Sequence, residues 1–150
     1  MKLRASTCLL ALLVASCTSP SKSELDGEVR RLCAIDGGIK VYEQVALSKD
    51  KFNQYGQVNF YRPTQGEYSL GPEYLVRRDV HYYRQGNPEM SRLHYQVIRR
   101  ADSKLLGESI RYGRGGGDMP GPWHGSSFSC PNPKEGIENS LLKSIFVEMK

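Results

Sequence analysis

Apolar and polar residues alternate most regularly in the middle of the chain, which predicts a β-sheet there. Short polar segments separate three such runs, and connections this short join antiparallel neighbours. The second connection is the dipeptide Asp102-Ser103, between Ala101 and Lys104. The three predicted strands are Tyr74 to Arg84, Arg92 to Arg100 and Lys104 to Tyr112.

Helical spacing of apolar residues occurs on both sides of this region. Ser23 begins the first predicted helix, with Asp26 three residues later in a capping-box-like arrangement, and Gly37-Gly38 ends it. The second predicted helix occupies Gly136 to Lys150, where apolar residues recur every four positions. The apolar faces consist of Leu25, Val29 and Leu32 in the first helix, and Ile137, Leu141, Ile145 and Met149 in the second.

The segment between the first helix and the sheet is less regular. Ile39 to Leu47 alternates and predicts a strand, Gln57 to Arg62 predicts another, and Pro63 to Pro72 predicts a loop. Together these elements predict an α+β fold. We expect an antiparallel β-sheet meander with an N-terminal and a C-terminal helix packed on one face.

One face of the predicted sheet carries a candidate binding row. Pairing Ala101 with Lys104, together with a matching register in the preceding hairpin, aligns His81, His94 and Arg111 across three strands. Two imidazoles and a guanidinium suit an anionic group, which makes this row a candidate ligand-binding site. The alternative is that these are ordinary polar residues on the solvent side of a sheet.

The first sixteen residues predict an export signal. Lys2 and Arg4 precede a short apolar core, Cys8 to Ala15. This core is too short for a permanent membrane helix, which needs about 20 apolar residues. We expect residues 1–16 to be removed from the mature chain.

Val14-Ala15-Ser16-Cys17 resembles the lipobox of bacterial lipoproteins. The resemblance implies that Cys17 Sγ carries a diacylglycerol, that cleavage follows Ser16, and that the new amino group of Cys17 is acylated. It therefore implies a protein held at a membrane by its lipid. An aspartate directly after the lipidated cysteine would resemble the retention signal of inner-membrane lipoproteins, but Thr18 occupies this position. We therefore expect the protein to be anchored in the outer membrane, with the domain facing the periplasm. The alternative is an ordinary secretory signal in which Cys17 is incidental.

These features divide the chain into three parts. Residues 1–16 form the signal, residues 17–24 form the lipidated cysteine and a flexible polar tether, and residues 25–150 form a single α+β domain.

The remaining cysteines predict one disulfide bond. Cys8 leaves with the signal and Cys17 is lipidated, so Cys33 and Cys130 remain in an oxidising compartment. The alternative is two buried free thiols. No CxxC pair is present and the three histidines are scattered, so we expect neither a metal nor another cofactor.

Net charge argues against a nucleic-acid-binding protein. Lys2 and Arg4 leave with the signal, so the 21 Lys and Arg residues become 19 against 16 Asp and Glu, a balance of +3. The segment Tyr74 to Arg114 is more basic, with nine basic and four acidic residues. Such a segment suits acidic lipid headgroups or an acidic partner, and the alternative is an ordinary solvated face.

The glycine-rich segment Gly113 to Pro131 does not match a phosphate loop or a nucleophile elbow. Its Asp118, His124, Ser126 and Ser127 suggest a hydrolase only by residue type, and we assign no catalytic residue. We expect an irregular loop, which Trp123 and Cys130 hold to the core and which is available to a partner.

Four segments carry a second resemblance. GGIKVYE, NFYRPTQGE, HYYRQGNPEMSR and PGPWHGSSFSCP are similar to small, uncharacterised proteobacterial lipoproteins, a class that implies no activity. The sequence thus predicts a non-enzymatic envelope lipoprotein, a structural or interaction module with a possible envelope protein partner. One alternative is a small-ligand or metal-binding lipoprotein that uses His81, His94 and Arg111. The other is an envelope hydrolase that uses the His124 loop.

Overall fold

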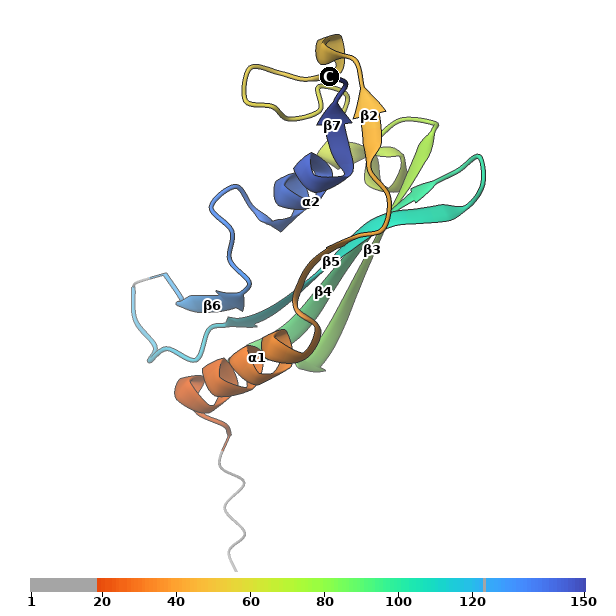
Figure 1. Cartoon of the computed structure of the whole chain (residues 1–150). Coiled ribbons are helices and arrows are strands. Elements are labelled where there is room, and N and C mark those ends of the chain that lie inside the picture. The colour runs from red at the N-terminus through yellow and green to blue at the C-terminus, as the bar shows by residue number, and fades with distance from the viewer. Residues whose placement is uncertain (1–18, 123) are drawn as a thin grey trace, which may run out of the picture.

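An antiparallel sheet lies at the centre of the computed structural model, which describes residues 19–122 and 124–150 (Figure 1). In these residues five strands join in the order β1-β5-β4-β3, with β6 also paired to β5. The strands are β1 (Gly38–Val41), β3 (Tyr74–Arg84), β4 (Glu89–Arg99), β5 (Lys104–Gly115) and β6 (Ser127–Cys130). The predicted meander is therefore present as β3, β4 and β5.

Helix α1 (Lys22–Asp36) begins earlier than the sequence indicated. The capping box is formed by Ser21 and Glu24: the Glu24 amide donates to Ser21 Oγ and the Ser21 amide donates to Glu24 Oε2. Both Ser21 and Ser23 have an acidic residue three positions later, so the sequence offers two boxes. The Ser23 prediction was wrong because Asp26 is used in a tertiary ion pair with Arg114. The first turn of α1 consequently includes the end of the predicted tether.

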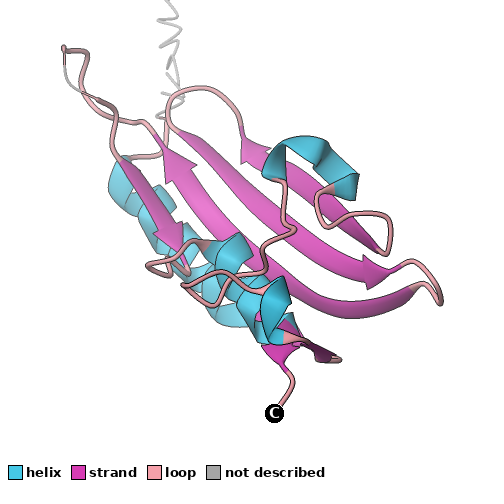
Figure 2. Ribbon diagram, turned by 90° about the horizontal axis from the view of Figure 1, so that it is seen from above, coloured by secondary structure: helices cyan, strands magenta, loops and turns pink. Residues whose placement is uncertain are grey.

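The predicted α+β class is confirmed, with α1 and α2 (Ile137–Ile145) both contacting the sheet. They contact opposite faces, whereas we expected one face (Figures 1 and 2). Alternate residues of a strand point to opposite sides. Met90 of β4 packs against α1, and Tyr95 and Val97 of the same strand lie in the cluster that contains α2 residues. Each face of the sheet therefore has its own apolar cluster.

The chain after α1 leaves the sheet sooner than predicted. The expected strand Ile39 to Leu47 is split into β1, which pairs with β5, and β2 (Val45–Leu47). Strand β2 instead pairs in parallel with β7 (Phe146–Glu148), which directly follows α2. The predicted second strand is reduced to a single bridge between Phe52 and Val58. Two short 3-10 helices, η1 (Lys49–Lys51) and η2 (Pro63–Tyr68), complete this region.

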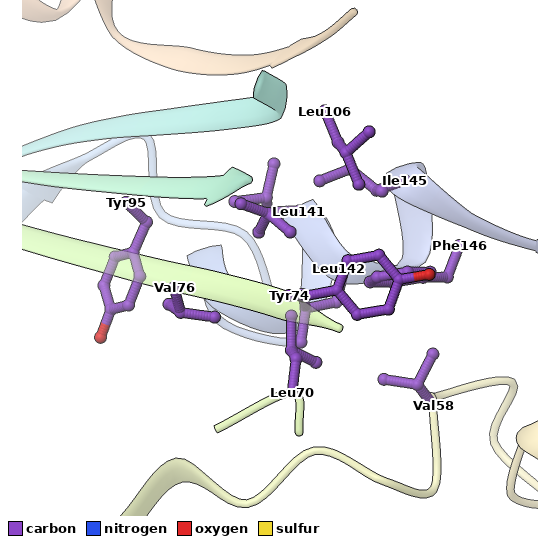
Figure 3. Packing of buried hydrophobic residues seen from close by; sticks show 11 residues of the cluster. Val58, Leu70, Tyr74, Val76, Tyr95, Leu106, Leu141, Leu142, Ile145 and Phe146 are labelled. Atoms are coloured by element: carbon purple, nitrogen blue, oxygen red, sulfur yellow. The ribbon is translucent and has the colours of Figure 1, made fainter. Parts of the chain in front are cut away.

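The larger hydrophobic cluster lies between α2 and the sheet (Figure 3). Phe146 is its centre: the rings of Tyr74 and Phe60 meet it edge-on, with centroids 5.0 and 5.8 Å away. Edge-to-face geometry brings the positive rim of one ring to the negative face of the other. The α2 side chains that enter this cluster are Leu141, Leu142 and Ile145.

A disulfide bond joins Cys33 to Cys130, as predicted. It connects the last turn of α1 to β6, and its Cα atoms are 5.8 Å apart. Gly37, the residue directly after the last residue of α1, ends the helix. The bond therefore holds α1 against the end of the sheet where β5 and β6 pair.

Removing this bond will lower stability substantially. The two cysteines are 97 residues apart in sequence, and a loop of this size corresponds to about 4.7 kcal/mol in the chain-entropy model. We expect Cys33→Ala/Cys130→Ala to lose about that much free energy of unfolding in a urea titration. Reduced wild-type protein will lose the same amount, and a loss below about 1 kcal/mol would contradict the account.

Close packing of α2 requires a glycine at position 107. A Cβ atom there would lie 2.9 Å from Ile145 Cδ1 and 2.9 Å from the Lys40 carbonyl oxygen. We expect Gly107→Ala to lower the free energy of unfolding by about 1–3 kcal/mol, because one of these neighbours must move. Gly27→Ala in α1 is the matched control: nothing lies within 4 Å, so it will be neutral or stabilising. Equal effects in thermal unfolding would contradict this prediction.

Candidate functional site

The predicted row of His81, His94 and Arg111 does not form. His81 lies opposite Arg92, and His94 lies between Asp79 on β3 and Ile110 on β5. Arg111 lies opposite Leu93. The two histidines therefore share the α1 face of the sheet, and Arg111 lies on the other face.

The cause is the local geometry of the β4–β5 hairpin. In the β4–β5 pair Lys104 lies opposite Arg99, and Leu106 is an extra residue in β5 between the paired Leu105 and Gly107. The net result is a shift of one residue from the predicted register. A shift of one residue moves a side chain to the opposite face, which separates Arg111 from His94.

His94 belongs to a small polar cluster on the α1 face. Its Nε2 is 2.7 Å from Glu108 Oε2, and the Tyr42 hydroxyl donates to Glu108 Oε1 at 2.6 Å. Burial acts to raise the pKa of Glu108, but the hydrogen bonds from Tyr42 and His94 outweigh it, so the pKa lies below its usual range. This cluster links the residue directly after β1 to β4 and β5 and has the character of a structural network.

Arg111 lines a groove on the α2 side of the sheet, in the part that α2 leaves uncovered. The groove has a volume of about 380 Å³ and extends from β3 to β6. Its charged lining residues are Arg78, Arg111, Arg114 and Glu89, and the rest of its lining is apolar, hydroxyl-bearing or glycine. We call it the Arg111 groove; its walls include Val80, Tyr82, Phe128 and Ser129.

The glycine-rich loop is held by a buried arginine. Arg114 is only 4% exposed. Its Nε donates to Asp26 Oδ1 of α1 at 2.8 Å, and its Nη1 donates to the carbonyl oxygens of Gly116 and Ser126. A buried charge is tolerated when its donors are paired in this way. Cys130 also holds the loop, as predicted, whereas Trp123 lies outside the described residues.

The hydroxyl of Ser126 is part of the same network. It donates to Asp118 Oδ1 at 3.0 Å and accepts a hydrogen bond from Arg114 Nη1 at 2.9 Å. Within residues 19–122 and 124–150, no hydrogen bond joins His124 to Ser126 or Asp118. The contacts of Ser126 with Asp118 and Arg114 tie the two ends of the glycine-rich loop together, and we call this arrangement the loop clamp.

Asp118 completes the clamp. It accepts hydrogen bonds from Lys22 Nζ at 2.6 Å and from the Ser126 amide and hydroxyl. These bonds hold the pKa of Asp118 at about 2. Sequence analysis missed the roles of Lys22 and Arg114, because their partners lie 96 and 88 residues away along the chain.

Two further observations concern metals and membranes. Within the described part of the chain, no group of three or more His, Cys, Asp or Glu side chains is placed to hold a metal ion. The helices described there are too short or too polar to cross a bilayer. The predicted signal, the lipobox-like sequence and Cys17 lie outside the described residues.

Comparison with known proteins finds no match among protein families, curated proteins or solved structures.

The clamp predicts a pH dependence of stability. The pKa of Asp118 falls from 3.8 to about 2 on folding, so its contribution is fully present above pH 4 and is lost as the pH falls towards 2. We expect the difference in thermal midpoint between wild type and Asp118→Asn to shrink across this range. Lys22→Met removes the largest cause of the shift, so the contribution of Asp118 will be smaller and its loss will be complete at a higher pH. A difference that stays constant from pH 5 to pH 2 would refute this assignment.

Proposed function

We propose that this protein is a lipid-anchored protein of the bacterial cell envelope, a non-enzymatic module that works by interaction. The observation that carries the proposal is Val14-Ala15-Ser16-Cys17, a lipobox-like sequence directly before a folded domain. The disulfide bond between Cys33 and Cys130 supports it, because such bonds persist in oxidising compartments. Thr18 favours the outer membrane, with the domain in the periplasm.

The anchor has a simple physical basis. Each buried methylene contributes about 0.8 kcal/mol, so several acyl chains on Cys17 hold the protein at a bilayer for long times. Four residues separate Cys17 from the first residue of α1, Lys22. Since an extended residue spans about 3.5 Å, α1 begins within about 20 Å of the lipidated cysteine. The domain therefore stays close to the membrane surface.

Interaction, rather than catalysis, is the role that the surface supports. The Arg111 groove and the neighbouring strand β3 form a large uncovered part of the sheet. The ligand-binding alternative loses its basis, since His81, His94 and Arg111 are not aligned. The hydrolase alternative loses its basis because Ser126 is held by Asp118 and Arg114.

Mass spectrometry of the protein extracted from membranes tests the proposal. We expect a chain that begins at Cys17 and is heavier than the polypeptide by a diacylglycerol and an amide-linked acyl group. Cys17→Ser removes the only site for the thioether, so this variant will lack the added mass and leave the membrane fraction. Cys33→Ala/Cys130→Ala, the matched control, will keep both the added mass and the membrane association. A cleaved wild-type chain without lipid would overturn the proposal in favour of an ordinary secretory signal.

A further inference from the structure

The outer edge of β3 is open. Strand β3 is the last in the order β1-β5-β4-β3, so one side pairs with β4 and, in the described residues, no strand pairs with the other (Figure 2). Helix η2 packs near the start of β3, where Tyr74 and Val76 are buried. The seven residues 77–83 are then all exposed. An edge of this kind presents backbone N–H and C=O groups that can pair with another strand.

This edge carries arginines and an aspartate, but the other features that usually protect an exposed strand are missing from it or confined to its end. The strand is eleven residues long and contains neither proline nor lysine. Its bulge, at Tyr83, lies at the far end, so the backbone is regular up to Tyr82. Val80 and Tyr82 are large apolar residues with 39% and 46% of their surface exposed. Long, regular and partly apolar edges favour strand addition.

The sequence of the open segment is complementary to itself. It reads Arg-Arg-Asp-Val-His-Tyr-Tyr from Arg77 to Tyr83. We propose that β3 pairs antiparallel with β3 of a second copy of this chain, with Val80 opposite the partner's Val80. Asp79 then lies opposite the partner's His81, and Arg78 lies opposite the partner's Tyr82. Each of these cross-strand pairs is formed twice because the arrangement is two-fold symmetric.

Symmetry and charge select this register. In a continuous antiparallel sheet made of two copies, the two-fold axis is perpendicular to the sheet. Paired side chains must lie on the same face, so the axis passes beside one residue, which then lies opposite the same residue of the partner. If the axis passed beside Asp79, the carboxylates of the two copies would lie opposite each other and repel. If it passed beside His81, Arg78 would lie opposite the partner's Arg84, which again brings like charges together. Centring on Val80 opposes no like charges. Val80 is also the midpoint of the exposed segment 77–83.

The two faces of the pairing differ. Asp79 and His81 lie on the α1 face, and Arg78, Val80 and Tyr82 lie on the face that carries the Arg111 groove. The pairing therefore continues the sheet from one copy to the next and places the two grooves on the same side of it. Arg78 opposite the partner's Tyr82 can form a cation–π interaction, with the guanidinium over the aromatic ring.

A seven-residue edge is a small interface compared with the standard area of about 1,600 Å². We expect a weak dimer in dilute solution that is populated where copies are concentrated. Attachment of both copies to one membrane raises their effective concentration, and this last step alone rests on the proposed lipid anchor.

A charge-exchange experiment on the full chain, purified in detergent, tests the pairing. His81→Asp places a carboxylate opposite Asp79 in both symmetric pairs, and we expect the dissociation constant of the dimer to rise about tenfold. Asp79→His/His81→Asp exchanges the two charges and will restore it, because the pair is reciprocal. The dissociation constants are measured by analytical ultracentrifugation. A double variant as weak as His81→Asp, or a wild type that remains monomeric at every concentration, would overturn the proposal.

A second variant tests the register without altering charge. Val80→Cys places two thiols opposite each other at the two-fold axis, and we expect a reducible covalent dimer when the full chain is treated with a mild oxidant. Tyr55→Cys is the matched control, because Tyr55 is 68% exposed and remote from β3 in sequence. Equal crosslinking of the two variants would refute the register.

The outcomes separate this inference from the proposed function. Cys17→Ser will dimerise in solution as the parent does, because the pairing needs no lipid. A chain without lipid that still dimerises through β3 would refute the anchor alone, and a lipidated chain that stays monomeric would refute the pairing alone.

Discussion

The extra residue at Leu106 is the constraint on which the arrangement of the sheet depends. Leu106 is fully buried in the cluster that contains the α2 side chains. After it, the pairing of β5 with β4 is displaced by one residue. Ile110 and Tyr112 therefore point towards α1, and Arg111 points towards the Arg111 groove. A single bulge thus decides which side chains form the second core and which remain open to solvent.

The second constraint is the set of long-range bonds that fix helix α1. Three bonds join α1 to distant parts of the chain: the disulfide bond to β6, the Asp26–Arg114 ion pair to β5 and the Lys22–Asp118 ion pair to the glycine-rich loop. These bonds hold a helix whose apolar face is narrow, with only Leu25 and Val29 fully buried. Strand β3 lies at the edge of the sheet opposite to β1, and the Arg111 groove extends from it to β6.

Local patterns predicted the elements that depend on local physics. The alternation in β3, β4 and β5, the helical spacing at both ends and the glycines after α1 all follow from backbone geometry. The pairing of Cys33 with Cys130 followed from counting the remaining thiols. Predictions failed where two local choices were nearly equal. Ser21 and Ser23 both preceded an acidic residue, and Ile39 to Leu47 alternated well enough for one strand although it forms β1 and β2.

By itself, the sequence determined the α+β class, the central meander, the disulfide bond and the lipobox-like motif, because each depends on residue type at short range or on a count. Tertiary structure alone decided the registers, the opposite placement of α1 and α2, and the separation of His81 and His94 from Arg111. It also decided that Arg114 and Asp118 form a clamp. The reason is that a bulge or an ion pair between distant residues is chosen by how well the whole core packs, and no local pattern records that choice.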